Sequence, residues 1–158
     1  MTHYNDKMKM IKDILKNVNK KKKQHYKKWK KLNKLSSIIK ASVNGLNAIS
    51  VSSLVLALTP ASPIFMIVAL TSTSISSIVS AVSTAYELEN KVQRHQTSYL
   101  QYADIYRDIS ARILRSGLSS EDLDVLLVEL NVRLGLIEDN SPPLEKQKST
   151  KNNINMTM

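Results

Sequence analysis

The sequence lacks cysteine altogether and contains only three glycines in 158 residues. Without thiols the chain can form neither disulfide bonds nor thiolate metal sites. The glycines, Gly45, Gly117 and Gly135, are far apart, so they build no glycine-rich loop of the kind that cradles phosphate groups. Classes of nucleotide-binding protein that depend on such a loop are therefore excluded.

Clusters of catalytic residue types are missing as well. His3, His25 and His95 are isolated in the sequence, and no serine lies in a nucleophile elbow. An enzyme needs a convergent set of acids, bases, nucleophiles or metal ligands. We therefore predict no enzymatic activity, no cofactor, and no catalytic, cofactor-binding or metal-binding residues.

A long segment of the chain carries no charged residue: no Lys, Arg, His, Asp or Glu occurs from Ala41 to Tyr86. This stretch is more than twice as long as the roughly 20 apolar residues with which a helix crosses a ~30 Å bilayer core. Two prolines in the segment from Thr59 to Pro63 lack amide donors and disfavour helix in the residues before them. The pattern predicts a hydrophobic helical hairpin with a tight reversal at that segment and membrane spans at 41–59 and 64–86.

Positive charge dominates the rest of the chain, with 23 Lys and Arg against 13 Asp and Glu, a net charge of +10 and a pI near 9.8. The excess lies before Lys40, next to the hairpin, where a polybasic segment contacts a bilayer with anionic headgroups. One interpretation is a membrane-surface contact formed by Lys27, Lys28, Trp29, Lys30 and Lys31; the other is a solvated helix face. Nucleic acid is disfavoured as a partner because no recognition motif accompanies the charge.

Polar residues inside the charge-free stretch recur at helical spacing. Side chains that share a face in this way allow close helix approach and hydrogen bonding inside a bilayer. The residues predicted to pack there are Asn44, Asn47, Ser50, Thr73, Ser76, Ser80 and Ser83. A second interpretation of the same stripe is a polar pore lining formed by several copies.

Two heptad seams of matching length flank the hairpin. The first, within 7–40, contains Met8, Ile11, Leu15, Val18, His25, Trp29, Leu32 and Ile39, and we expect fraying or a bend near Asn19. The second, within 87–116, contains Leu88, Val92, His95, Tyr99, Tyr102, Tyr106, Ile109 and Ile113. Because a hairpin returns the chain to its starting side, the seams are predicted to pair as an antiparallel stalk. His95 is interpreted as a packed core histidine in preference to a metal ligand.

A last helix is predicted from Ser120 to about Leu136, after a stop at Gly117 and an N-cap with an acidic residue three places on. Its apolar face comprises Leu123, Leu126, Leu127, Leu130, Leu134 and Ile137. Pro142 and Pro143 end regular structure, and 144–158 is predicted to be a disordered polar tail. The fold class is therefore all-α: one helical membrane domain, 1–143, with a membrane hairpin, a coiled-coil-like stalk and a short C-terminal helix.

The order of these elements resembles the SLATT family of two-transmembrane domains. The residues that carry the resemblance are Lys27 to Leu35, Glu87 to Tyr106 and Leu134 to Pro142, and it covers the chain from about Lys27 to Pro143. Such a resemblance implies a membrane effector that acts by pore formation or membrane perturbation when a nucleotide-sensing partner triggers it. Related domains also occur in proteins of large DNA viruses.

Three hypotheses follow from the sequence. The first is a two-span, multi-pass membrane protein with both termini cytoplasmic, acting as a homo-oligomer that forms pores or perturbs membranes, with a separate sensor protein as partner. The second is a structural membrane or minor capsid protein in the internal membrane of a virus particle, with a capsid protein as partner. The third is a soluble helical bundle in which the hairpin forms the buried core. No cleaved signal peptide is predicted at the polar N-terminus.

Overall fold

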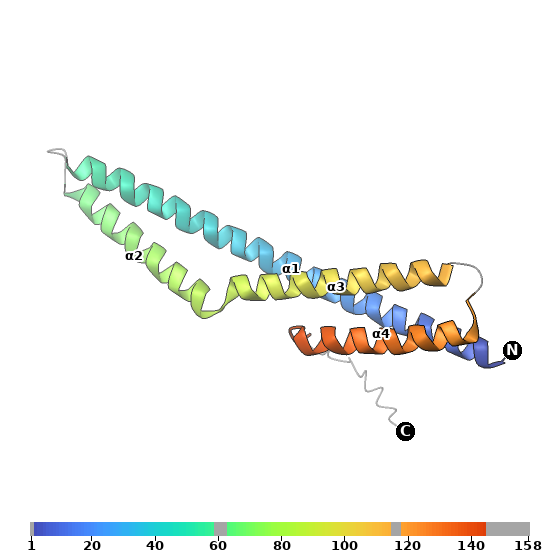
Figure 1. Ribbon diagram of the computed structural model, residues 1–158. Helices are drawn as coiled ribbons and strands as arrows, with labels where there is room; N and C mark the ends of the chain where they lie inside the picture. Colours follow the sequence, from blue (N-terminus) through green and yellow to red (C-terminus); the bar gives the residue numbers. More distant parts are fainter. Residues whose placement is uncertain (1, 59–62, 115–117, 145–158) are drawn as a thin grey trace, which may run out of the picture.

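The computed structural model describes residues 2–58, 63–114 and 118–144, and within them the chain is helical apart from short turns and the non-helical residues 118–119 and 141–144. Four helices follow one another in the order α1 (Thr2–Ala57), α2 (Ile64–Ala85), α3 (Leu88–Leu114) and α4 (Ser120–Asn140). The predicted all-α fold class is confirmed. Figure 1 shows an elongated molecule in which α1 runs alongside α2 at one end and alongside α3 and α4 at the other.

Helix α1 is continuous over 56 residues and is about 84 Å long at 1.5 Å per residue. The basic helix 7–40 and the span 41–59 that the sequence predicts therefore belong to one element. The helix has no break near Asn19, where fraying or a bend is predicted, because the neighbouring seam residues Leu15 and Val18 are buried against the other stalk helices.

The return path is divided, since α2 ends at Ala85 and α3 begins at Leu88. Between them the Glu87 amide donates to the Thr84 carbonyl over 2.9 Å, and Glu87 has φ +47°. This left-handed conformation is strained for a residue with a Cβ atom. The reversal predicted at Thr59 to Pro63, the helix stop at Gly117 and the tail predicted for 144–158 lie wholly or mostly outside the described residues.

The stalk has a continuous apolar core made by α1, α3 and α4. Its buried members are Ile11, Leu15, Val18, Tyr102, Ile105, Ile109, Leu123, Leu126, Leu130 and Ile137. Ser98 and Ile105 are buried although the predicted seam omits them, because α3 contacts α4 as well as α1 and so needs a wider packed face than a two-helix seam provides.

Helix α4 begins at a capping box and is tied to α1, to which it runs parallel, by ion pairs. Ser119 and Asp122 form the predicted capping box: the Ser119 hydroxyl accepts from the Asp122 amide over 3.1 Å, and the Asp122 carboxylate accepts from the Ser119 amide. Near the start of the helix Lys7 lies 2.6 Å from Asp124, and near its end Lys21 pairs with Glu138. The helix continues to Asn140, beyond the predicted end.

Candidate membrane hairpin and its boundary with the stalk

The hairpin has most of its large apolar side chains on the outside. Those exposed on α1 and α2 include Ile49, Val51, Leu54, Val55, Leu56, Ile64, Met66, Ile67, Leu70, Ile75, Ile78 and Val82. The residues buried between the two helices are small or hydroxylated: Ser50, Ser53, Ala69, Ser72 and Ser76. This arrangement is the reverse of a water-soluble helix pair, in which large aliphatic residues occupy the interior.

Hydrogen bonds join polar side chains of α1 and α2, of which Ser50 and Ser76 are buried. The Ser76 hydroxyl donates to Asn47 Oδ1 over 2.7 Å, and the Thr73 hydroxyl donates to Ser50 Oγ over 3.0 Å. Ser50 in turn donates to the Ala69 carbonyl over 3.3 Å. Four of the residues predicted for intramembrane packing, Asn47, Ser50, Thr73 and Ser76, thus meet within one chain.

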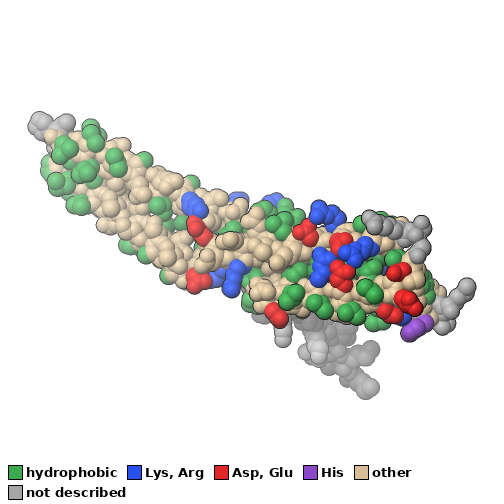
Figure 2. Space-filling model, viewed as in Figure 1, with side chains coloured by type: hydrophobic (Ala, Val, Ile, Leu, Met, Phe, Trp, Pro, Cys, Tyr) green, Lys and Arg blue, Asp and Glu red, His purple; other side chains and the backbone are tan. Residues whose placement is uncertain are grey.

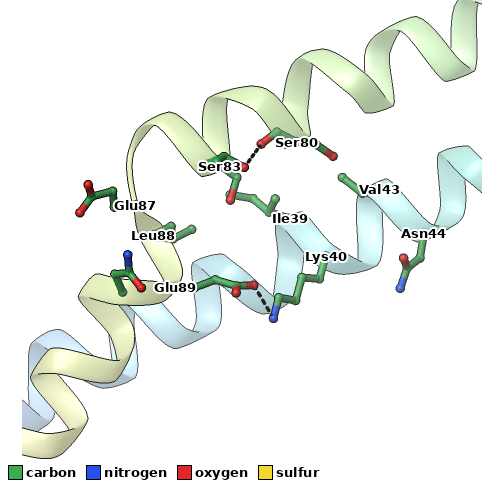
Figure 3. Close-up of a pocket in the computed structure, with 11 residues that line it drawn as sticks. Ile39, Lys40, Val43, Asn44, Ser80, Ser83, Glu87, Leu88 and Glu89 are labelled. Carbon is green, nitrogen blue, oxygen red and sulfur yellow. Dashed lines mark hydrogen bonds and ion pairs between the residues drawn. The ribbon is translucent and has the colours of Figure 1, made fainter.

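The remaining three predicted packing residues, Asn44, Ser80 and Ser83, lie nearer the stalk and line a groove of about 660 Å³. Lys40 and Glu89 point toward one another at its edge, with Nζ and Oε1 2.7 Å apart (Figure 3). The groove lies where the charge-free segment ends and the charged stalk begins.

The residues predicted for membrane-surface contact occupy the stalk. Trp29 is half-buried and stacks on Tyr99 of α3, with ring centroids 6.3 Å apart and an interplanar angle of 3°. Lys27, Lys30 and Lys31 are exposed. Figure 2 shows Lys, Arg, Asp and Glu side chains on the stalk, whereas the hairpin end carries none on the visible face.

The predicted α3 seam faces α1 through its aromatic and histidine members. Leu88, His95, Tyr102 and Ile109 are buried, and Val92, Tyr99, Tyr106 and Ile113 are partly buried. A cation–π contact places Lys22 Nζ 4.4 Å from the centroid of the Tyr106 ring. The seam thus lies along the contact between the two long helices.

His95 meets His25 across the stalk, with their Nδ1 atoms 3.0 Å apart. The His25 ring also stacks on Tyr102, with centroids 5.5 Å apart. Burial, then His95, Lys28 and Lys21, lower the pKa of His25 from 6.5 to about 4; burial and Lys28 lower the pKa of His95. Each histidine stands in its own predicted seam, so pairing the two seams was the signal that could have identified this contact.

Neither histidine is part of a larger ligand set: the described residues contain no group of three or more His, Asp or Glu side chains arranged to hold a metal ion.

Two helices, α1 and α2, each contain a stretch long and apolar enough to cross a membrane. No protein-family model matches the sequence, and no curated protein or solved structure matches it significantly.

Proposed function

We propose that this chain is a two-span integral membrane protein that self-associates through its helices and perturbs the bilayer in which it assembles. The observation that carries the proposal is the reversed packing of the hairpin, with large aliphatic side chains outside and hydrogen-bonded hydroxyl groups inside. In water the exposed aliphatic surface is unfavourable, whereas lipid tails solvate it. The same observation argues against the soluble bundle, whose core would be the hairpin.

The orientation follows from the distribution of charge. From Lys7 to Lys40 the only acidic residue is Asp13, and this segment adjoins the hairpin at its stalk end. Basic segments beside membrane spans remain on the cytoplasmic side. The proposed topology therefore places the stalk and both termini in the cytoplasm and the α1–α2 connection on the opposite side.

The absence of cysteine makes a labelling experiment direct. Single cysteines are introduced by Leu58→Cys at the far end of α1 and by Lys9→Cys in the stalk, two positions that are exposed in the structure. In sealed vesicles a membrane-impermeant maleimide should label the two variants from opposite faces. Labelling of both from one face, or release of the chain by carbonate washing, contradicts the two-span proposal.

Self-association and bilayer perturbation need their own measurements. The mass of the detergent-extracted complex should be a multiple of the chain mass, and the purified protein should release dye from liposomes. The matched control is Ser76→Leu, which places a large side chain between α1 and α2, where Ser76 is buried. If the wild-type protein releases no more dye than detergent without protein, the proposed bilayer-perturbing activity is contradicted.

A structural role in a membrane-containing virus particle is the second candidate, and the outer face of α4 favours it. Val125, Val128, Val132 and Leu136 are exposed there at steps of three and four residues, outside the stalk core. An exposed apolar row on a stalk helix is a surface for docking another protein. Stoichiometric recovery in purified particles without dye release would support this role over the first.

A further inference from the structure

We infer that one side of the hairpin is a binding site for a single phospholipid with an ethanolamine headgroup. The inference rests on the proposed membrane function and adds the lipid class that the protein selects. It combines two hollows, a mixed-charge groove at the stalk boundary and an apolar hollow farther along the hairpin.

The two hollows open to the same side of the hairpin. On α1 their lining includes Lys40, Asn44, Val51 and Leu54, and on α2 it includes Met66, Leu70, Thr73, Ser80 and Thr84. Within each set the spacing is three, four or seven residues, so each set forms one row along its helix. Both hollows lie between these two rows. Their facing edges on α1, at Asn44 and Val51, are about 10 Å apart at 1.5 Å per residue.

The linings of the hollows match the two halves of a phospholipid. The boundary groove, about 660 Å³, combines charged, amide and hydroxyl groups with the apolar side chains of Ile39, Val43 and Leu88. The second hollow, about 390 Å³, is lined mainly by apolar side chains, those of Val51, Leu54, Met66 and Leu70. In the second hollow the Ser50 and Thr73 hydroxyls are bonded to each other and to backbone, so they leave the surface apolar. A headgroup therefore suits the first hollow and an acyl chain the second.

The charges in the boundary groove favour a zwitterion. Lys40 can bind a lipid phosphate, and the start of α3 at Leu88 adds backbone amides and the positive end of a helix dipole. Glu89 and the amide of Asn90 can accept from an ammonium group. Lys40 and Glu89 are largely exposed and paired only with each other among the described residues, so one headgroup can replace their single ion pair with two.

Ethanolamine fits better than the other common headgroups. A primary ammonium donates three hydrogen bonds, which carboxylate and amide oxygens can accept, whereas choline has no N–H donor and is bound by aromatic cages. The groove lining contains no aromatic side chain. Glycerol and serine headgroups leave a net negative charge, which Glu87 and Glu89 repel. This choice differs from the general attraction of the stalk lysines to anionic lipid, because it depends on the paired charges at Lys40 and Glu89.

The test uses the full chain, purified in detergent with equal amounts of phosphatidylethanolamine, phosphatidylcholine and phosphatidylglycerol, followed by native mass spectrometry. We expect one phosphatidylethanolamine per chain, retained at least fivefold over either competitor. Glu89→Gln should abolish the preference over phosphatidylglycerol, and Lys40→Ala should lower retention of all three lipids. The matched controls Lys34→Ala and Glu121→Gln, exposed residues outside both hollows, should behave as wild type.

Equal retention of the three lipids, or equal behaviour of the groove and control variants, overturns the inference. Soluble glycerophosphoethanolamine and inorganic phosphate are tested at the same concentration, and binding of either as tightly as the lipid also overturns it, because the apolar hollow would then contribute nothing. Circular dichroism checks that every variant is folded. Resistance to carbonate washing is measured separately, so failure of membrane insertion is distinguished from failure of lipid selection.

Discussion

His25 and His95 lie on different helices of the stalk, yet their Nδ1 atoms are 3.0 Å apart and their side chains are 1% and 5% exposed. At this distance one Nδ1 must carry a hydrogen and donate to the other, so the accepting Nδ1 is unprotonated when the contact forms. Protonating the acceptor places a buried positive charge beside a second N–H donor and near Lys21 and Lys28. The contact is therefore compatible with neutral pH and opposed by acid.

Stalk stability should fall as the pH is lowered from 6.5 toward 4. The pKa of His25 is about 4 in the folded chain and 6.5 without these contacts, so the unfolded chain binds more protons between those values. The contribution is fully present above pH 6.5, is lost as the pH falls through this window, and amounts to about 3 kcal/mol. Thermal unfolding followed by circular dichroism at several pH values measures it.

The control for that experiment is the double variant His25→Leu with His95→Leu, which removes both titrating rings from the stalk. Its melting temperature should depend much less on pH across the same window, and His3→Gln, which alters an exposed histidine, should keep the wild-type dependence. Equal pH dependence in the wild type and the double variant would contradict this account.

Ile109→Ala should destabilise the stalk by about 2–5 kcal/mol, the usual cost of truncating a fully buried aliphatic side chain. Ile109 is 0% exposed and belongs to the core shared by α1, α3 and α4. Val132→Ala, on the exposed face of α4, should change stability by no more than about 0.5 kcal/mol. Denaturant unfolding of both variants in detergent gives the comparison, and similar losses would contradict the assigned core.

Ser76→Leu and Ser77→Leu distinguish the inner face of α2 from its exposed side. Ser76 is buried and bonded to Asn47, whereas Ser77 is exposed. The first substitution loses a hydrogen bond and overpacks the contact with α1, at a combined cost of about 2–4 kcal/mol. The second should be neutral. Thermal melting in micelles distinguishes them, and a greater loss for Ser77→Leu would mean that α2 is rotated from this arrangement.

Glu87→Gly should leave stability unchanged or raise it by up to about 1 kcal/mol, because glycine adopts a φ of +47° without steric strain. Glu87→Val should lower stability by about 1–2 kcal/mol, since a β-branched residue fits the left-handed region poorly. Melting temperatures of the two variants test the turn directly. A valine variant as stable as the glycine variant would show that this residue does not keep its left-handed conformation.

Much of the helical layout follows from the sequence because periodicity and charge encode it locally. The charge-free stretch indicates the hairpin, the heptads of α3 predict most of its packed face, and Ser119 with Asp122 identifies the start of α4. The sequence is less informative where helices meet in three dimensions. Burial of Ile105 and Ser98 depends on α4 returning along α3, which no local pattern reveals.

The candidate site shows the same limit. Asn47, Ser50, Thr73 and Ser76 could be predicted as packing residues because small hydroxyl groups at helical spacing have few other uses in a membrane. Lys40 and Glu89 are 49 positions apart, and only the fold brings them within 2.7 Å. The left-handed turn at Glu87 was also beyond prediction, since glutamate carries no preference for that conformation.

One long helix beside a divided one fixes how this molecule can deform. Helix α1 passes the stalk boundary without interruption, so it acts as a stiff member that keeps its direction from the stalk into the hairpin. On the return path, the turn at Tyr86 and Glu87 separates α2 from α3. A change in this turn would alter the distance between Glu89 and Lys40 without requiring any change in α1, which has no break at the boundary.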